Sequence, residues 1–383
     1  MPIDHGRPNL HFDKTPADPP PITGVATSIT AFIGGAQQGP LDKPRVVHSF
    51  AEFQRVFGPL AQANPLGYAV QHYFLNGGRQ AVVVRVAAPD QVVGPGFDRE
   101  RRGLYALDEV DLVNLLCLPP FSFERDVDPD TWQKTLMYCK ARRAMLLVDP
   151  PANWGTPEQA LSGMEGLNLR DENAALYFPR LKAADPLQGD ALVDFAPSGA
   201  VAGVIARMDE RHGVWKAPAG EQAVLLGIAD LAYHLDDPEN SLLNQAGINC
   251  LRTFPEAGSV IWGARTLAGG DQQSTEWKYI PVRRFALFLE ESLERGAQWA
   301  VFEPNGEALW SRVRRQVEAF LYTLFREGAF AGSTTDQAYF VHCDRQTMTE
   351  EDIENGILNI PVGFAPLKPA EFVILKIQQK LAG

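Results

Sequence analysis

One acidic run of the chain, Asp126-Val127-Asp128-Pro129-Asp130, carries carboxylates at alternate positions, as the opening of a calcium-binding loop does. Such a loop also needs a glycine at its sixth position and a bidentate carboxylate at its twelfth. These positions hold Thr131 and Met137 here. We therefore expect a solvated loop that leads into the N-terminus of a helix, where acidic side chains are favourable.

Two further residues stand where α/β enzymes carry catalytic groups. Asp149 follows an apolar run, at the end of a strand where α/β proteins often bind ligands. Ser198 precedes Gly199, but a nucleophile elbow also needs a glycine two residues before the serine, and Ala196 is there. We therefore expect Ser198 to cap the following helix, and Asp149 to be an ordinary acid at a strand boundary.

The glycine, histidine and cysteine patterns do not indicate a cofactor. Gly94-Pro95-Gly96 lacks the third spaced glycine of a dinucleotide fingerprint, and the seven histidines lack metal-ligand spacing. His342 and Cys343 are neighbours, so on a strand they point to opposite faces and cannot activate each other. We expect no cofactor, no metal and no enzyme. The cysteines have no C-x-x-C spacing and read as buried free thiols of a reducing cytoplasm: Cys117, Cys139, Cys250 and Cys343.

An acidic cluster falls on the predicted helix after Pro281. Glu290, Glu291 and Glu294 lie within about one turn of each other, so two of them could act in acid–base chemistry. A solvated acidic face, balanced by the neighbouring Arg295, is the commoner arrangement, and we expect that one.

Length and composition restrict the class of protein. A chain of 383 residues with 45% hydrophobic residues is long enough for two or three folded domains. The formal charge of −12 argues against a general nucleic-acid binder, which needs a basic face for phosphate. The first residues lack a basic-then-apolar signal, and no apolar run approaches the roughly 20 residues that span a bilayer. We expect a protein that is made in the cytoplasm, does not insert into membranes and does not bind nucleic acid.

The chain reads as an α/β protein. Residues 81–86, 111–118 and 144–149 are apolar runs typical of strands buried on both faces. A helical pattern over 131–142 separates the second strand from the third, and this order predicts a parallel crossover unit.

A long helix is predicted over 307–326. Its apolar residues recur every three or four positions and form a stripe: Trp310, Val313, Val317, Phe320, Leu321 and Leu324. Arg312, Arg314, Arg315 and Arg326 fall largely off this stripe. They form either a solvated basic face or a basic ridge that docks on an acidic partner.

Both ends of the chain carry short apolar segments that could pair as strands. Near the start the segment is Leu10, His11 and Phe12, and near the end it is Phe372, Val373, Ile374, Leu375, Lys376 and Ile377. A terminal strand needs a sheet edge to pair with, and a neighbouring subunit can offer that edge. This pattern favours a polymer over an enzyme.

The last third of the chain contains long runs that carry a family resemblance. They are W-K-Y-I-P-V-R-R at 277–284, E-E-S-L-x-R-G-x-Q-W-x-V-F-E-P-N at 290–305, and P-A-E-F-V-I at 369–374. Shorter matches follow at 21–28, 74–79, 196–199 and 247–252. From about Pro21 onward the chain resembles the contractile tail sheath proteins of phages and of phage-tail-like injection systems. The start departs from the family, whose usual Pro-Gly-Val-Tyr-Val-Glu-Glu opening is replaced by Pro8-Asn9-Leu10-His11-Phe12-Asp13-Lys14.

The resemblance implies a structural subunit that stacks as hexameric rings around an inner tube and contracts to drive the tube through an envelope. It implies as partners further copies of the chain, the inner tube protein, and baseplate and tail terminator or cap proteins. In the family, the helix equivalent to 307–326 faces the inner tube, which favours the docking interpretation for its four arginines. The terminal segments are expected to exchange between subunits.

The expected domains are an extended arm over 1–21, an outer α/β domain over 22–245 with room for two subdomains, and a C-terminal α/β domain over 246–383. The last of these ends in an extended arm from about residue 370. Two alternatives stay open at this point. One is an α/β enzyme that uses Asp149 or Ser198, and the other is a non-contractile capsid or adaptor protein.

Overall fold

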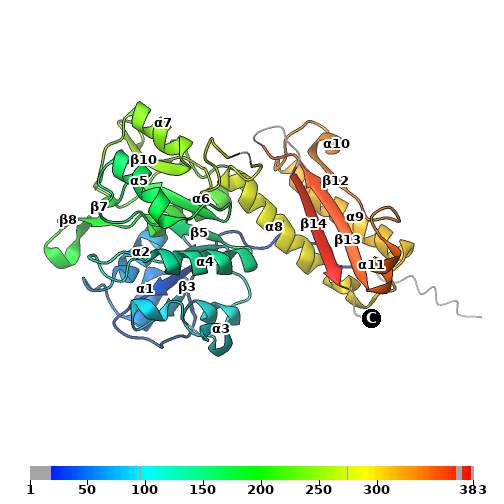
Figure 1. Cartoon of the computed structure of the whole chain (residues 1–383), viewed down its shortest axis with the longest axis horizontal. Coiled ribbons are helices and arrows are strands. Elements are labelled where there is room, and N and C mark those ends of the chain that lie inside the picture. Colours follow the sequence, from blue (N-terminus) through cyan, green and yellow to red (C-terminus); the bar gives the residue numbers. More distant parts are fainter. Residues whose placement is uncertain (1–18, 95, 274, 368–372, 381–383) are drawn as a thin grey trace, which may run out of the picture.

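The structure, a computed structural model, describes residues 19–94, 96–273, 275–367 and, as backbone alone, 373–380. Figure 1 shows two parts, a larger one with β1 to β11 and a smaller one in which helices lie behind a narrow sheet. Helix α8 (Ile280–Ala297) runs from one part to the other. Helices and strands mix in several sheets, which confirms the predicted α/β class.

The larger part is built on an eight-stranded sheet with the order β11-β10-β6-β5-β4-β1-β3-β2. Strands β10 to β3 in this order pair in parallel, and the edge strands β2 and β11 run antiparallel. The strands are β1 (Thr30–Gly34), β2 (Arg45–Val47), β3 (Ala81–Arg85), β4 (Leu115–Cys117), β5 (Met145–Val148), β6 (Ala174–Phe178), β10 (Ile248–Phe254) and β11 (Gly258–Trp262).

Helices cover both faces of this sheet, because successive strand residues point to opposite sides and both sides are apolar. Ile33 and Leu146 face α4 and α5, whereas Phe32 and Leu147 face α1, α2 and α6. The helices of this part are α1 (Phe50–Phe57), α2 (Pro65–Leu75), α3 (Phe97–Glu100), α4 (Pro129–Ala141), α5 (Pro157–Leu167), α6 (Ser198–His212) and α7 (Asp237–Gln245).

Helices α2 and α6 pack closely because α6 has glycines at the contact. A Cβ at Gly199 would meet the carbonyl oxygen of Ala69, and one at Gly203 would meet that of Tyr73. Only glycine lets the two backbones approach this far. This close packing places the N-terminus of α6 directly above the sheet.

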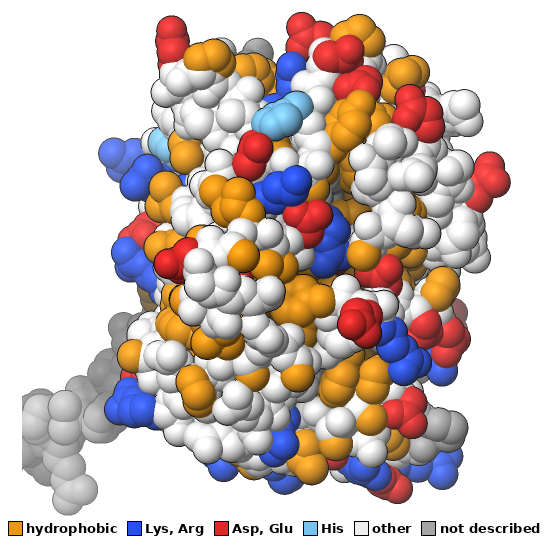
Figure 2. Space-filling model, turned by 90° about the vertical axis from the view of Figure 1, so that its left-hand side faces the viewer, with side chains coloured by type: hydrophobic (Ala, Val, Ile, Leu, Met, Phe, Trp, Pro, Cys, Tyr) orange, Lys and Arg blue, Asp and Glu red, His pale blue; other side chains and the backbone are white. Residues whose placement is uncertain are grey.

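A small antiparallel sheet with the order β8-β7-β9 extends from the larger part. Its strands are β7 (Leu181–Asp185), β8 (Ala191–Phe195) and β9 (Asp230–Leu231). Figure 2 looks onto this end of the molecule, where hydrophobic, acidic and basic side chains are interspersed rather than gathered into a field of one sign.

The smaller part packs α8 and α9 against a sheet with the order β12-β13-β14. Its core is separate from the cores of the larger part and gathers Phe285, Val313, Leu321 and Phe364. The remaining elements are α9 (Glu307–Arg326), α10 (Thr335–Ala338), β12 (Tyr339–Val341), α11 (Glu350–Glu354), β13 (Ile357–Phe364) and β14 (Val373–Lys380).

The large sheet extends past the domain division predicted at residues 245 and 246. Strand β10 pairs in parallel with β6, and β11 pairs with β10, so both belong to the larger part. The chain leaves this sheet after Trp262 and enters α8 at Ile280. Local sequence patterns do not reveal this, because strand pairing joins segments about seventy residues apart.

Candidate functional site

Helix α9 has the buried stripe that its sequence predicted. The predicted stripe residues are all buried, and Leu309 and Gln316 join them. They pack on α8 and the C-terminal sheet, so the opposite side of α9 is left facing outward. Asn305 has a residue type that favours helix caps, but it does not cap α9, whose N-cap is Gly306. Its amide instead donates to the carbonyl of Ile357 and accepts from the indole N–H of Trp310.

The four arginines of α9 have different surroundings. Arg312 is largely covered: its guanidinium lies 4.6 Å from the centre of the Trp299 ring, and Nη1 is 3.3 Å from a carboxylate oxygen of Glu303. Arg312 therefore stabilises the fold of this part and does not contribute to a free basic surface. The one ion pair that Arg314 makes with the described residues is a long one, to Glu318 at 3.9 Å.

Arg315 and Arg326 are exposed and define the outward side of α9. Arg315 donates to the carbonyl of Ser311, and Arg326 has no ion pair among the described residues. At about 100° per residue, Ser311, Arg315, Ala319, Tyr322 and Arg326 fall within about 80° of one another. We call these five residues the α9 face.

Tyr322 lies between the two arginines of the α9 face and is 49% exposed. The sequence analysis did not name Tyr322 as a site residue, although an aromatic side chain outside the apolar stripe indicates an exposed position. Exposed tyrosine and arginine beside small residues are the side chains enriched at protein interfaces. The α9 face can therefore bind a protein surface by charge and by stacking.

The C-terminal strand lies at an edge. β14 pairs antiparallel with β13, with Phe364 opposite Val373 and Ile357 opposite Lys380. Its other edge has no strand partner among the described residues. Residues Val373, Ile374, Leu375, Lys376 and Ile377 of the predicted exchange segment lie in β14, whereas Phe372 and the N-terminal Leu10, His11 and Phe12 lie outside the described residues.

The acidic cluster of α8 is not a solvated face. Arg143, two residues after α4, reaches across to it, with Nη1 3.0 Å from Glu291, Nε 3.5 Å from Glu290 and a further ion pair to Glu294. Burial raises the pKa of Glu290. Burial acts in the same direction on Glu291, but hydrogen bonds from Arg295 and Arg143 outweigh it and lower its pKa. The cluster joins α8 to the larger part.

A second contact between the two parts is a buried ion pair. Arg284 of α8 donates to both carboxylate oxygens of Asp209 in α6, at 2.8 and 2.6 Å. Thr27 completes the group: its hydroxyl donates to Asp209, and its carbonyl accepts from Arg284. Both charged side chains are almost fully buried, so each charge compensates for the hydration that the other loses.

Asp149 and Ser198 do come together, but in a structural arrangement. Asp149 accepts hydrogen bonds from the backbone N–H of Ser198 at 2.8 Å and from its hydroxyl at 2.7 Å. Ser198 is the first residue of α6 and not its cap, so the carboxylate satisfies the orphan N–H of that helix. Both Asp149 and Ser198 are buried, and a cavity of about 20 Å³ at the carboxyl ends of β1 and β4 is lined by neither of them.

The buried carboxyl of Asp149 predicts a pH-dependent stability. Burial raises its pKa from 3.8 to about 6, against the hydrogen bonds from Ser198. A folded-state pKa above the unfolded value means that this contribution to stability is full below pH 3.8 and is lost as pH rises through 6. The parent should therefore lose about 1–2 kcal/mol of unfolding free energy between pH 5 and 7.5 through Asp149. We expect Asp149→Asn to lack this part of the loss, as measured by urea unfolding at each pH.

The matched control for this prediction is Asp194→Asn, at an exposed position of β8. It should keep the pH dependence of the parent. Equal slopes for the parent and for Asp149→Asn would contradict the prediction.

The described residues contain no group of three or more His, Cys, Asp or Glu side chains that could hold a metal ion. They also contain no helix that is both long and apolar enough to cross a membrane.

Comparisons with known proteins agree with the sequence resemblance. The family model of the phage tail sheath protein central domain matches residues 104–267, and that of the phage tail sheath C-terminal domain matches 272–380. The tail sheath protein of Vibrio phage KVP40 is 27% identical over 179 residues. That match covers 46% of this chain and 25% of the relative, so the chain spans about a quarter of the phage protein's length.

Solved structures are similar over almost the whole chain. The PVC sheath complex of an extracellular contractile injection system, in its contracted state, is 27% identical with a TM-score of 0.75 and covers 99% of both chains. A chain of the sixfold-symmetrised anti-feeding prophage baseplate is 29% identical with a TM-score of 0.72, covering 98% of this chain and 99% of that one. Both family models and these full-length matches agree, and the chain belongs to the contractile tail sheath protein family.

Proposed function

We propose that this chain is the sheath subunit of a phage-tail-like contractile particle, which stacks as hexameric rings around an inner tube and drives it through an envelope on contraction. The observation that carries the proposal is the position of β14. It pairs along its whole length with β13 and leaves its outer edge without a strand partner among the described residues. An edge strand presents backbone N–H and C=O groups that can pair with a strand of another subunit.

We propose that neighbouring subunits are connected by strand exchange, in which the β14 of one subunit pairs with the β13 of the next. Within one chain, β13 and β14 form an antiparallel pair whose connection includes residues 365–372. The β14 of a neighbouring subunit can take the same register on β13, because backbone hydrogen bonds do not depend on which chain supplies the strand. The joint then persists while side-chain contacts change during contraction. The segment Leu10, His11 and Phe12 is proposed to add to such a sheet from the other end of the chain.

We also propose a division of labour between the two parts. The chain passes from one to the other between Trp262 and Ile280, and the two family models also divide there. The larger part is proposed as an outer body without catalysis. The smaller part is proposed to carry the subunit joints and the tube contact, with baseplate and cap proteins as further partners. Assembly is proposed to take place in the bacterial cytoplasm.

The inner tube contact is proposed to be the α9 face. Arg315 and Arg326 have no acidic partner among the described residues, so an acidic tube surface can bind them without breaking an existing ion pair. Arg314, held only by its long ion pair with Glu318, can reinforce them. Arg312 is proposed to act indirectly, by holding Trp299 and Glu303 beneath the start of α9.

Charge reversal tests this contact. We expect Arg315→Glu with Arg326→Glu to weaken coating of the inner tube roughly tenfold, because each exposed charge pair contributes up to about 1 kcal/mol and the reversal adds repulsion. The measurement is co-sedimentation of the chain with preformed tubes at several salt concentrations. Binding of the parent should weaken with salt, since exposed pairs are screened.

A single reversal elsewhere provides the control. Arg345→Glu changes an exposed arginine of the same part, outside α9, and should coat tubes as the parent does. If the double variant also coats tubes as well as the parent, the α9 face is only a solvated surface.

A further inference from the structure

One aromatic side chain of the smaller part is unusually exposed. Phe302 is 85% exposed, more than any other large apolar side chain of the described residues. It is the last residue of a short 3-10 helix, Gln298–Phe302, just before α9. Burying such a ring against a partner would remove its apolar surface from water, which makes Phe302 a candidate contact residue.

The backbone beneath Phe302 is held firmly. The indole N–H of Trp299 donates to Gln316 at 2.8 Å, and Ala300 is fully buried. On the other side, the Asn305 amide donates to the carbonyl of Ile357 at 3.1 Å. Phe302 is therefore presented as a fixed knob, and little backbone freedom is lost when it binds.

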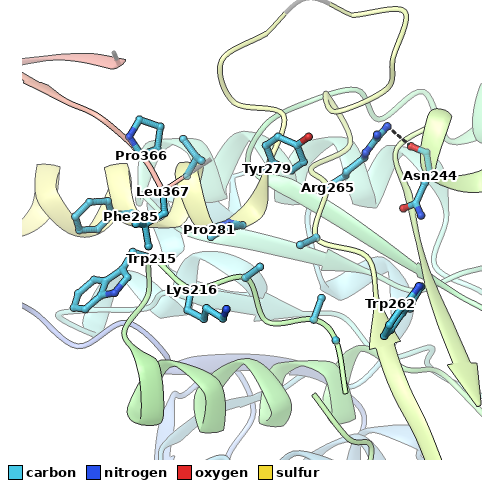
Figure 3. A pocket seen from close by; sticks show the side chains of 15 residues that line it. Trp215, Lys216, Asn244, Trp262, Arg265, Tyr279, Pro281, Phe285, Pro366 and Leu367 are labelled. Carbon is cyan, nitrogen blue, oxygen red and sulfur yellow. Dashed lines mark hydrogen bonds between the residues drawn. The ribbon is translucent and has the colours of Figure 1, made fainter. Parts of the chain in front are cut away.

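The same chain contains a pocket of matching character. A cavity of about 620 Å³ opens between the loop after α6, the end of β11 and the start of α8 (Figure 3). Its walls include Trp215, Trp262, Tyr279, Pro281 and Phe285. The Trp215 ring meets Phe285 edge-to-face at 5.7 Å, which leaves aromatic edges and faces for a further ring.

Charges beside the knob and the pocket are complementary. Lys216 lies at the pocket, is exposed, and has no ion pair among the described residues. Glu307 begins α9 five residues after Phe302, is exposed, and likewise has no ion pair in the described part of the chain. An acid at the start of the helix that follows the knob and a cation at the pocket favour one orientation of docking.

We infer that Phe302 of one subunit inserts into the Trp215–Phe285 pocket of another copy of this chain, with Glu307 facing Lys216. Phe302 does not line the pocket of its own chain. A knob and a pocket on different patches of one chain make a head-to-tail contact, which repeats from copy to copy as a helical assembly requires. The inference rests on the proposed function, because it needs a homopolymer.

Cross-linking tests the contact directly. All four native cysteines are buried, so introduced thiols are the accessible ones. Chains with Phe302→Cys are mixed with chains with Ala217→Cys, a pocket residue, then assembled and mildly oxidised. We expect disulfide-linked pairs in the mixture and not in either chain alone. Met137→Cys, at an exposed apolar position of α4, replaces Phe302→Cys in the control and should give none.

Assembly strength gives an independent readout. We expect Phe302→Ser to raise the critical concentration for assembly tenfold or more, and Met137→Ser to leave it unchanged. Lys216→Glu and Glu307→Lys should each weaken assembly, and the two changes together should restore it.

The outcomes separate the inference from the function on which it rests. If the parent polymerises and Phe302→Ser does so equally well without cross-linking, the knob-and-pocket contact is wrong and the sheath proposal stands. If Phe302→Ser weakens only attachment to the inner tube, the knob binds the tube and the inference is again wrong. A parent that forms no polymer refutes the sheath proposal as well.

Discussion

Locking β14 onto its own β13 is expected to abolish tube formation by the purified chain. Asn359 and Gln378 lie directly opposite each other in the register of the two strands. Opposed residues of an antiparallel pair have Cα atoms about 4.5–5.5 Å apart, within the range that a disulfide spans. A disulfide between Asn359→Cys and Gln378→Cys keeps β14 in its own chain, so strand exchange stops while the fold is kept. Negative-stain microscopy and light scattering measure the tubes.

Reducing the introduced disulfide between positions 359 and 378 is the internal control for this experiment. A thiol reductant should return tube formation to the locked chain, and the native cysteines should not interfere because all four are buried. Deletion of residues 373–383 gives a second route to the same result: soluble, folded subunits without tubes. Undiminished tubes from either the locked or the truncated chain would sink the strand-exchange proposal.

Replacing Arg284, the buried cation between the two parts, is expected to lower the unfolding free energy far more than replacing an exposed arginine. In the parent, Arg284 Nη2 lies 2.6 Å from a carboxylate oxygen of Asp209. Arg284→Met removes this cation and leaves the buried carboxylate with the Thr27 hydroxyl as its remaining side-chain donor. An uncompensated buried charge typically costs about 3–5 kcal/mol of unfolding free energy. The arginine also bridges α6 to α8, so the loss should appear in the cooperative unfolding of the whole chain. Denaturant unfolding followed by tryptophan fluorescence measures it.

An exposed arginine provides the comparison. Arg345→Met removes an ion pair to Glu350 in which both side chains are more than half exposed, and should change the unfolding free energy by less than about 0.5 kcal/mol. If Arg284→Met costs no more than Arg345→Met, the buried pair does not hold the two parts together. A double change of Arg284 and Asp209 to apolar residues should recover part of the loss, because no charge is then left unpaired.

The local patterns of the sequence were good guides to single elements. The stripe of α9 and the parallel crossover through α4 are both present. Ser49, a residue type that favours helix caps, does cap α1: its hydroxyl accepts from the N–H of Glu52. These features depend on residues a few positions apart, so periodicity and capping chemistry suffice to predict them. The strand predicted over 111–118 is shorter, Leu115–Cys117, and just before it the Asn114 side chain accepts a hydrogen bond from the N–H of Ile29.

Partners distant in the chain were not predictable in the same way. The glutamates of α8 looked like a solvated face, yet Arg143, almost 150 residues earlier, binds three of them. Ser198 looked like a cap, yet Asp149 satisfies the helix N-terminus instead. In each case the sequence shows the charged or polar group, and the fold alone shows which group it meets.

By itself, the sequence of this protein determined its class: an α/β chain with a basic helix and an apolar terminal strand. Apolar runs and helical spacing carry that information because they depend on residues a few positions apart. The similarity to tail sheath proteins rests instead on the long runs at 277–284 and 290–305. The tertiary structure decided which side chains stay free. It covers Arg312 with Trp299, leaves Arg315 and Arg326 exposed, and raises Phe302 on a firmly held turn. Exposure depends on what packs nearby from elsewhere in the chain, and no local pattern contains that.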